Sequence, residues 1–559
     1  MRIGMKLPAV LFCFAVFVLP AWGEIGLPMK IPFAITANFG ELRTNHFHTG
    51  LDMRAPINTP VYAVDSGYVS RISVSSGGYG NALYIDHPSL GITTVYGHLN
   101  SFSPEIEKRL HEGQQRLGFY AVDLYFSPDD IPVKRGEMVA RSGNRGSSGG
   151  PHLHFEVRET ISERPLDPLK YYKDRLKDTR PPSIQSVSVM QYPGVAGERC
   201  LDKYSVSAGG SAKRVKEPIK AWGKVVLGVK AYDYVTGMSN IYGVRSVKLY
   251  KDGELVFFSQ IDTLDFSLGR MINTFVDYRD WMENRSFYMQ SYVSPGNRLP
   301  FYKVAVNDGI VDIDEERDYN FKYELSDLYG NTETCFFTIR GDKNSRIDET
   351  LRQSMVGFDA PFEIKGDNFS FQVPANATYE DWAPVYDVQV CDKAGCYSAK
   401  HTVSPQYLPL DKACRISIRV DNDTLSQKTQ YYIADATPRR GKVRYSYLNT
   451  SYSDGWVSAK CTTLGSYVVL RDSIPPTITP LGVSGGELRF KVVDKESGVN
   501  FFKGEIDGKF VVFQSDCKDN IARYRIDDSV FARGKRHHVR FTAIDNCRNV
   551  RVYESSILF

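Results

Sequence analysis

The most informative stretch of the sequence is a glycine-rich turn followed by two histidines, and it reads Ser142-Gly143-Asn144-Arg145-Gly146-Ser147-Ser148-Gly149-Gly150-Pro151-His152-Leu153-His154-Phe155-Glu156. Glycine and proline interrupt regular structure, so this order predicts a loop that leads into a strand. Successive side chains of a strand face opposite sides of the sheet, which places His152 and His154 on one face about 7 Å apart. Phe155 and Val157 would then point the other way, into a hydrophobic core.

Two further histidine motifs precede this stretch. The first is His48-Thr49-Gly50-Leu51-Asp52 and the second is Tyr96-Gly97-His98-Leu99. His48 and Asp52 add a nitrogen and an oxygen donor, and Gly50 permits a backbone bend between them. Two imidazoles and one carboxylate leave a fourth coordination position for water, which is typical of catalytic zinc. A lone pair of histidines also occurs on solvated surfaces, so the prediction of a Zn2+ site depends on all three motifs.

These motifs together resemble those of the M23 family of zinc metallopeptidases, the lysostaphin-like peptidoglycan endopeptidases. The resemblance implies that His48, Asp52 and His154 are the zinc ligands, and that His98 and His152 are the catalytic pair beside the metal. It leaves open which of the two is the general base. Members that have lost catalysis typically lack one or more of these five residues, and all five are present here. The resemblance therefore implies an active enzyme.

The resemblance covers about residues 38–170 and implies an exported zinc endopeptidase that hydrolyses stem or cross-link peptides of peptidoglycan. A second hypothesis is a zinc-binding but non-catalytic regulator of another cell-wall hydrolase, and a third is a secreted peptidase that cleaves Gly-rich proteins. The segment 101–132 separates the last two motifs, and Pro104–Leu117 within it reads as a short helix. An insertion at this place is expected to lie near the substrate groove, narrowing it or acting as a lid.

The first 23 residues have the pattern of a secretory signal peptide. Arg2 and Lys6 form a basic start, Leu7–Leu19 is apolar, and Ala21-Trp22-Gly23 ends in a small residue suited to cleavage. The apolar stretch is too short to span about 30 Å of hydrocarbon. No later stretch is long and apolar enough, so the mature chain is predicted to have no membrane span. We expect export, to the periplasm or otherwise to the extracellular space.

Two Pro-Pro junctions divide the rest of the chain. They read Asp178-Thr179-Arg180-Pro181-Pro182 and Asp472-Ser473-Ile474-Pro475-Pro476. Consecutive prolines cannot continue a helix or a strand ladder, so they suit stiff joints between domains. The expected parts are a signal peptide at 1–23, an M23-like peptidase domain at 24–177, a β-sandwich module at 178–345, a β-rich module at 346–471 and a C-terminal β-sandwich module at 472–559.

The modules that follow the two junctions share a sequence repeat. Residues 243–258 align without gaps on residues 498–513 and are identical at seven of sixteen positions. Asp252-Gly253 and Asp507-Gly508 supply the positive φ angles that a tight hairpin needs. We therefore predict an all-β chain, with an N-terminal antiparallel sheet followed by immunoglobulin-like or fibronectin-like β-sandwiches. The ligand of these modules is left open as a protein or a glycan.

The composition agrees with an exported all-β protein. Aromatic residues make up 13% of the chain, which favours strands. Lys and Arg total 69 against 65 for Asp and Glu, and so thin a basic excess argues against a nucleic-acid-binding protein. The cysteines outside the signal peptide fall into even-numbered groups, which favours disulfides within domains over unpaired buried thiols. The groups are Cys200 and Cys335; Cys391, Cys396, Cys414 and Cys461; and Cys517 and Cys547.

Overall fold

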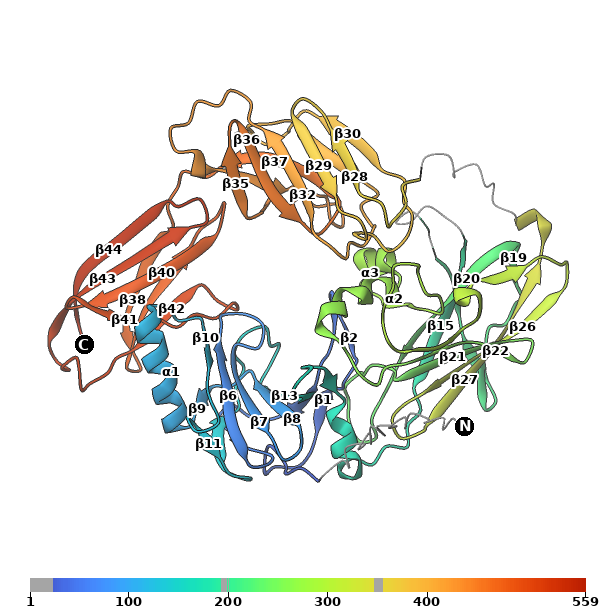
Figure 1. The fold of residues 1–559 in the computed structure, drawn as a ribbon, viewed down its shortest axis with the longest axis horizontal. Helices are drawn as coiled ribbons and strands as arrows, with labels where there is room; N and C mark the ends of the chain where they lie inside the picture. The colour runs from blue at the N-terminus through green and yellow to red at the C-terminus, as the bar shows by residue number, and fades with distance from the viewer. Residues whose placement is uncertain (1–23, 193–198, 200, 346–354) are drawn as a thin grey trace, which may run out of the picture.

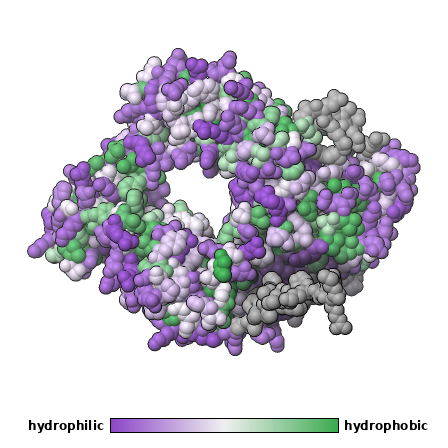
Figure 2. Space-filling model, viewed as in Figure 1, coloured by the Kyte–Doolittle hydropathy of each residue, from purple (hydrophilic) through white to green (hydrophobic). Residues whose placement is uncertain are grey.

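The computed structural model describes residues 24–192, 199, 201–345 and 355–559, and the expected signal peptide lies outside them. The described residues form mainly antiparallel sheets with few helices, so the prediction of an all-β chain that begins with an antiparallel sheet is confirmed. Figure 1 shows that successive β-rich parts follow one another around a central opening, and Figure 2 shows this opening passing through the molecule. None of the helices in the described part of the chain is long and apolar enough to cross a membrane.

The first part of the chain is built on a nine-stranded antiparallel sheet. The main strands in spatial order are β1 (Ile35–Ala37), β4 (Leu51–Arg54), β13 (His152–Glu159), β8 (Ile92–Gly97), β7 (Asn81–His87), β6 (Gly67–Val74) and β10 (Val122–Tyr125). The short strands β11 (Pro132–Val133) and β14 (Pro165–Leu166) pair with β6 and β13. Two small sheets are formed by β5 (Pro60–Tyr62), β12 (Met138–Arg141) and β9 (Ser101–Phe102), and by β2 (Leu42–Arg43) and β3 (His46–Phe47).

Strand β13 lies inside this sheet, and its two faces differ as the alternation predicts. Leu153, Phe155 and Val157 are fully buried in the hydrophobic core. The histidines therefore occupy the opposite, polar face of a strand that is paired on both sides. Burying a phenylalanine-sized side chain stabilises the fold by about 1.5–3 kcal/mol, so the core residues hold the strand and its polar face in place.

The insertion between the last two motifs contains a helix, as predicted, but the helix braces the sheet edge. Helix α1 (Pro104–Leu117) packs on β9 and β10, and β10 is the strand farthest from β4 along the sheet order. Phe119, just after the helix, contacts Phe501 of the C-terminal part at 5.4 Å between ring centroids. These contacts place α1 between the sheet and the C-terminal part (Figure 1), and its effect on the substrate groove stays a prediction.

The second part of the chain, after the first Pro-Pro junction, has two sheets. The smaller contains β16 (Asp202–Ser205), β15 (Ser183–Gln191), β20 (Gly223–Tyr232), β23 (Met289–Gln290) and β25 (Val311–Ile313). The larger contains β17 (Ser207–Gly209), β18 (Ala212–Arg214), β19 (Ile219–Ala221), β27 (Thr332–Gly341), β26 (Asp318–Ser326), β21 (Ser246–Lys251), β22 (Glu254–Gln260) and β24 (Tyr302–Ala305). Helices α2 (Ile272–Phe275) and α3 (Tyr278–Asn284) connect β22 to β23.

The remaining sheets lie on either side of the second Pro-Pro junction. Before it, one sheet contains β28 (Phe362–Lys365), β29 (Phe369–Val373), β32 (Cys414–Arg419), β36 (Trp456–Cys461) and β35 (Thr450–Ser453), and the other β30 (Val385–Gln389), β31 (Lys400–Ser404), β37 (Gly465–Arg471), β33 (Tyr431–Asp435) and β34 (Ser446–Tyr447). After it, the sheets are β38 (Thr477–Ser484), β39 (Glu487–Val493) and β42 (Ile521–Arg525), and β41 (Lys509–Val511), β40 (Val499–Ile506), β43 (Arg536–Asp545) and β44 (Val550–Leu558).

The sequence repeat has the predicted hairpins. Strands β21 and β22 pair across Asp252-Gly253, and β40 and β41 pair across Asp507-Gly508. Both aspartates have positive φ angles, 48° and 49°, as the tight turn requires.

Cysteine pairing follows the expected groups only in part. Cys391 and Cys396 form a disulfide within the third part, whereas Cys414 and Cys461 of the same expected group are buried free thiols. Cys517 is exposed and Cys547 is buried, and both are free thiols, so the expectation that these two pair is wrong. Cys200 lies outside the described residues, so its expected pairing with Cys335 stays a prediction.

The C-terminal part returns to the first sheet and closes the ring. Cys517 N donates a hydrogen bond to Ser76 O at 2.8 Å, and Gly146 N donates to Asp516 Oδ2 at 3.3 Å. Lys518 also donates to Asn144 O. The glycine-rich loop before β13 is therefore held from both sides, by its own sheet and by the last module.

Candidate metal centre

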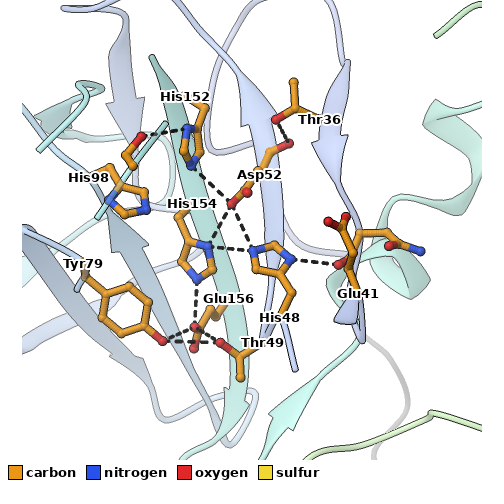
Figure 3. A network of polar contacts seen from close by, with 12 residues as sticks. Thr36, Glu41, His48, Thr49, Asp52, Tyr79, His98, His152, His154 and Glu156 are labelled. Atoms are coloured by element: carbon orange, nitrogen blue, oxygen red, sulfur yellow. Dashed lines mark hydrogen bonds and ion pairs between the residues drawn. The ribbon is translucent and has the colours of Figure 1, made fainter. Parts of the chain in front are cut away.

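Strand pairing brings the three motifs onto one face of the first sheet (Figure 3). In the register of the sheet, His154 on β13 is opposite Asp52 on β4 and opposite Gly97 on β8. His98 follows directly after β8, and His48 lies in the segment that leads into β4. The five residues singled out in the sequence are thus neighbours in the structure.

Three side chains point their donor atoms at one small volume. His48 Nε2 lies 3.1 Å from both Asp52 Oδ1 and His154 Nδ1. His154 Nδ1 lies 2.9 Å from Asp52 Oδ1. A tetrahedral zinc ion with bonds of 2.0–2.1 Å has ligand atoms about 3.3 Å apart. The donor set and its spacing therefore fit a divalent metal ion such as zinc, and these three residues are the ones that would hold it.

Backbone carbonyls orient the outer imidazoles of the site. His48 Nδ1 donates to Asn38 O at 2.7 Å, so His48 Nε2 is left unprotonated toward the centre. His98 Nδ1 donates to Arg145 O at 2.7 Å, and His152 Nδ1 donates to Gly150 O at 2.8 Å. Each of these bonds sets the tautomer and leaves Nε2 free to accept a proton or a metal.

His98 and His152 are neighbours beside the three-residue cluster. Their ring centroids are 4.8 Å apart, and His152 Nε2 lies 3.3 Å from Asp52 Oδ1. Burial, together with the neighbouring imidazoles of His154 and His152, lowers the pKa of His98 to about 3. The His98 ring is therefore neutral at pH 7. Its backbone has a φ of 58°, an uncommon conformation for a non-glycine residue that often occurs at functional sites.

The loop that orients His98 also contacts the C-terminal part. Arg145, whose carbonyl accepts from His98, donates from Nη2 to Gln514 Oε1 at 3.2 Å. The C-terminal module therefore touches the candidate site through the loop at residues 144–147.

Glu156 is the site residue that the sequence reasoning left without a role. Its carboxylate is completely buried, and Oε1 accepts from His154 Nε2 at 2.8 Å. The same oxygen accepts from Thr49 Oγ1 at 2.5 Å and Tyr79 OH at 2.6 Å, while Oε2 accepts from Arg158 Nε at 2.6 Å. The signal for this role was present in the sequence, because Glu156 follows His154 by two residues and so faces the same side of the strand.

Charge compensation explains how Glu156 stays ionised in the interior. Burial acts to raise the pKa of Glu156, but the Arg158 guanidinium and His154 outweigh it and hold this pKa well below its usual range. Burial acts to lower the pKa of His154, but hydrogen bonds to Asp52 and Glu156 raise it to about 9. The carboxylate therefore makes His154 a more basic ligand and fixes its Nδ1 toward the centre.

Replacing Glu156 with glutamine is expected to weaken zinc affinity by about 10- to 100-fold, because the neutral amide no longer pairs with Arg158 or raises the basicity of His154. Zinc competition against a chromophoric chelator measures this effect. Glu159→Gln on the exposed end of the same strand is the control, and it should retain full affinity. Equal zinc affinity of the two variants would show that Glu156 does not support the metal site.

Gly50 is required for close approach of two strands. The backbone bends at Gly50, as predicted, but its φ is not positive, so a left-handed conformation is not what requires glycine here. A Cβ at this position would lie 2.3 Å from Phe155 O and 2.8 Å from Glu156 Cγ. The absence of a side chain lets the His48–Asp52 segment lie directly against β13.

The variant Gly50→Ala is therefore expected to destabilise the first domain by roughly 1–3 kcal/mol and to reduce bound zinc, because the clash is with rigid backbone. Thermal unfolding and metal analysis of the full chain measure both effects. Gly149→Ala is the matched control, since a Cβ at that position would have nothing within 4 Å of it. An unchanged unfolding midpoint in Gly50→Ala would contradict the close-approach argument.

Residues 46–119 match the family described as Peptidase family M23, and residues 353–472 match a Zu5-like domain. The first match includes His48, Asp52 and His98, whereas His152 and His154 lie beyond it. The match at 353–472 covers nearly the same residues as the β-rich module expected at 346–471.

Several curated proteins are similar to the first part of the chain. DD-carboxypeptidase/endopeptidase Mpg of Neisseria meningitidis is 36% identical over 128 residues, which cover 23% of this chain and 23% of that protein. Peptidoglycan DD-endopeptidase ShyB of Vibrio cholerae is 36% identical over 124 residues, covering 22% of each. The chain thus spans less than a quarter of the length of these two relatives. A solved structure of a zinc-containing peptidase from Vibrio cholerae is 28% identical, with a TM-score of 0.20, over 26% of this chain and 39% of that one.

Proposed function

We propose that the protein is an exported zinc endopeptidase that hydrolyses peptide bonds in peptidoglycan, because residues 46–119 of its first domain match peptidase family M23. The observation that carries the proposal is the convergence of His48, Asp52 and His154 donor atoms within 3.1 Å of one another. The names of similar proteins, which include peptidoglycan DD-endopeptidases, support the substrate class.

In this proposal His48, Asp52 and His154 hold zinc. The metal supplies Lewis-acid polarisation of the scissile carbonyl and of water. The chain's own groups bind and orient the reactants. Asp52 Oδ1 lies at the centre of the site, within 3.3 Å of a ring nitrogen of His48, His152 and His154. These donor groups favour metal-assisted hydrolysis of an amide over attack by a serine or cysteine nucleophile.

His98 and His152 are the proposed catalytic pair. Because each donates Nδ1–H to a backbone carbonyl, each presents Nε2 as a base on the side of the cluster. One of them accepts a proton from the attacking water and returns it to the leaving amine. The other accepts a hydrogen bond from the same water through Nε2 and so holds it in place for attack.

The modules after residue 177 are proposed to position the enzyme or to bind a protein or glycan partner. We keep the domain boundaries 24–177, 178–345, 346–471 and 472–559, because most residues of the four main hydrophobic cores fall within these ranges. The exceptions join neighbouring domains: Val235 and Tyr242 belong to the first core, and Phe39, Phe47 and Tyr379 to the second. The paired sheets and repeated hairpins support an immunoglobulin-like assignment for the second and last modules. The pattern of residues 1–23 supports export, with the periplasm as the proposed location.

The test incubates the mature chain, from Glu24 to Phe559, with purified peptidoglycan and identifies released fragments by mass spectrometry. Metal-stripped and zinc-restored samples run in parallel, with a Gly-rich protein as a second substrate. New peptide termini from peptidoglycan that disappear on stripping and return with zinc are the expected result. Zinc binding without cleavage of peptidoglycan would overturn the proposal in favour of a regulator, and cleavage of the Gly-rich protein alone would overturn the substrate class.

A further inference from the structure

The two Pro-Pro junctions share a second feature. Each is preceded by an aspartate whose side chain contacts the module that follows the junction. There it meets two more aspartates, forming what we call the first and second acidic joints. The first joint contains Asp178, Asp233 and Asp327, and the second contains Asp472, Asp494 and Asp545.

The two acidic joints occupy equivalent places in the fold. Asp233 follows β20, and Asp494 follows β39, which are the strands paired with β15 and β38 directly after the junctions. Asp327 follows β26 and Asp545 ends β43, the strands paired with β21 and β40 of the sequence repeat. The same topology therefore delivers the same three carboxylates twice.

The hydrogen bonds of the junction aspartates are also repeated. Asp178 Oδ1 accepts from Thr236 N at 3.0 Å and from Thr236 Oγ1 at 3.1 Å. Asp472 Oδ2 accepts from Ser497 N at 3.1 Å and from Ser497 Oγ at 2.5 Å. Each junction aspartate is thus clamped by a hydroxyl residue that lies three positions after the second aspartate of its joint.

An asparagine locks the third aspartate in both joints. Asn331 donates from N and Nδ2 to the two carboxylate oxygens of Asp327, at 2.9 and 2.7 Å. Asn549 makes the same two bonds to Asp545, both at 2.8 Å. These bonds use the amide donors of the asparagines and hold the carboxylates facing one another.

Both joints concentrate negative charge out of water. Asp472 and Asp545 are 1% and 0% exposed, and Asp233 and Asp327 are 5% and 6% exposed. Among the described residues, none of the six aspartates forms an ion pair with a lysine, arginine or histidine within 4.0 Å. Asp178 is also buried, whereas Asp494 is half-buried. Carboxylates gathered in this way without a cation are unfavourable, so such a group either takes up protons or binds a metal.

The pKa of Asp233 reflects this crowding of negative charge. Burial, with the nearby Asp327 and Asp178 carboxylates, raises the pKa of Asp233 to about 8, although Arg180 acts at longer range to lower it. In the second joint, burial first and the neighbouring aspartates next raise the pKa of Asp494 and Asp545.

An unpartnered atom at the first joint points to a missing ligand. Asp233 Oδ1 is buried and has no hydrogen-bond partner. A cavity of about 30 Å³ lies at this joint, lined by all three of its aspartates and by Asp167. Arg245 also lines the cavity; its Nη2 is paired with Asp262 Oδ1 at 2.5 Å, and its buried Nε has no hydrogen-bond partner. The space is enough for one water or one bare cation.

Of the two joints, the second has its carboxylate oxygens close enough together to share one metal ion. One carboxylate oxygen from each of Asp472, Asp494 and Asp545 lies within 4.8 Å of the others. A cation with bonds of 2.3–2.6 Å spans ligand atoms up to about 5 Å apart, and oxygen-only ligands select hard cations. This group offers only carboxylates, with no imidazole or thiolate, and so differs from the histidine centre in the metals that it favours.

We propose that each acidic joint binds one calcium ion, through Asp178, Asp233 and Asp327 at the first Pro-Pro junction and through Asp472, Asp494 and Asp545 at the second. The ion ties the residue before the junction to the body of the module after it. The first joint sets the angle between the histidine-bearing sheet and the second module. The second sets the angle of the last module (Figure 1), whose residues 514–518 contact the loop before β13.

Calcium binding is tested on the zinc-loaded mature chain by equilibrium dialysis with elemental analysis, and by thermal unfolding over a calcium series at constant ionic strength. The expected result is up to two calcium ions per chain with unchanged zinc content, and an unfolding midpoint that rises with calcium. Modules of exported proteins bind with dissociation constants of about 10⁻⁴–10⁻³ M. Magnesium should bind more weakly, because its octahedral geometry is more demanding.

Three variants assign the ions to the joints. Asp233→Asn and Asp494→Asn should each lose one calcium ion, and the double variant should lose both and the rise in midpoint. Asp367→Asn, at an exposed aspartate outside the joints, is the matched control and should keep both ions. No calcium uptake by the unmodified chain at 5 mM (roughly five times the upper dissociation constant), or undiminished uptake by a folded double variant, would overturn the proposal. The unmodified chain decides the question even if a variant fails to fold.

Discussion

Asp52→Ala is expected to remove zinc from the protein and to lower peptidoglycan hydrolysis by at least about 10³-fold, the largest effect of any single change considered for this chain. The reason is the central place of the Asp52 carboxylate. Its Oδ1 lies 3.1 Å from His48 Nε2 and 2.9 Å from His154 Nδ1. Without it, two neutral imidazoles remain, and they lack the charge and the third donor that a catalytic zinc site requires.

Metal analysis and fragment release measured on the same preparation test this expectation. Asp129→Asn, at an exposed aspartate of the insertion, is the control and should retain one zinc and full activity. Circular dichroism should show that the Asp52→Ala chain remains folded, because the core behind β4 is unaltered. Stoichiometric zinc in folded Asp52→Ala, or normal turnover, would exclude Asp52 as a ligand.

His98→Ala and His152→Ala are expected to separate binding of the metal from turnover. Each variant should keep one zinc, because neither imidazole belongs to the cluster of His48, Asp52 and His154. Each should lower kcat by about 10²–10⁴-fold, the usual contribution of a general acid-base group. Replacing the residue that acts as the base should also abolish the fall of kcat/KM at low pH, because that fall reports protonation of the base.

His46→Ala is the matched control for this pair. His46 is exposed, and its Nδ1 is hydrogen-bonded to Thr44 O, so it belongs to the surface beside the site. The variant should show normal zinc content and normal kcat. Loss of zinc from His152→Ala would instead make His152 a ligand, and unaltered kcat in both catalytic variants would remove the pair from the mechanism.

The chemistry of the site could be predicted from the sequence because ligand types and local spacing are local properties. The alternation of a strand placed His152 and His154 on one face and Phe155 in the core, as the structure has them. The Asp-Gly hairpins followed from backbone preference in the same way. The pairing of Cys517 with Cys547 was wrong, because a disulfide depends on where two segments pack in the folded chain.

The sequence by itself determined an all-β chain, its Asp-Gly turns and the donor atoms offered to a metal, since composition, alternation and turn chemistry act within a few residues. Tertiary structure alone decided that His48 Nε2 meets His154 Nδ1 across 106 residues and that Glu156 accepts the hydrogen of His154 Nε2. It also decided that glycine at position 50 serves close strand contact. The acidic joints belong here too, because only the pairing of strands far apart in the sequence brings their three carboxylates together.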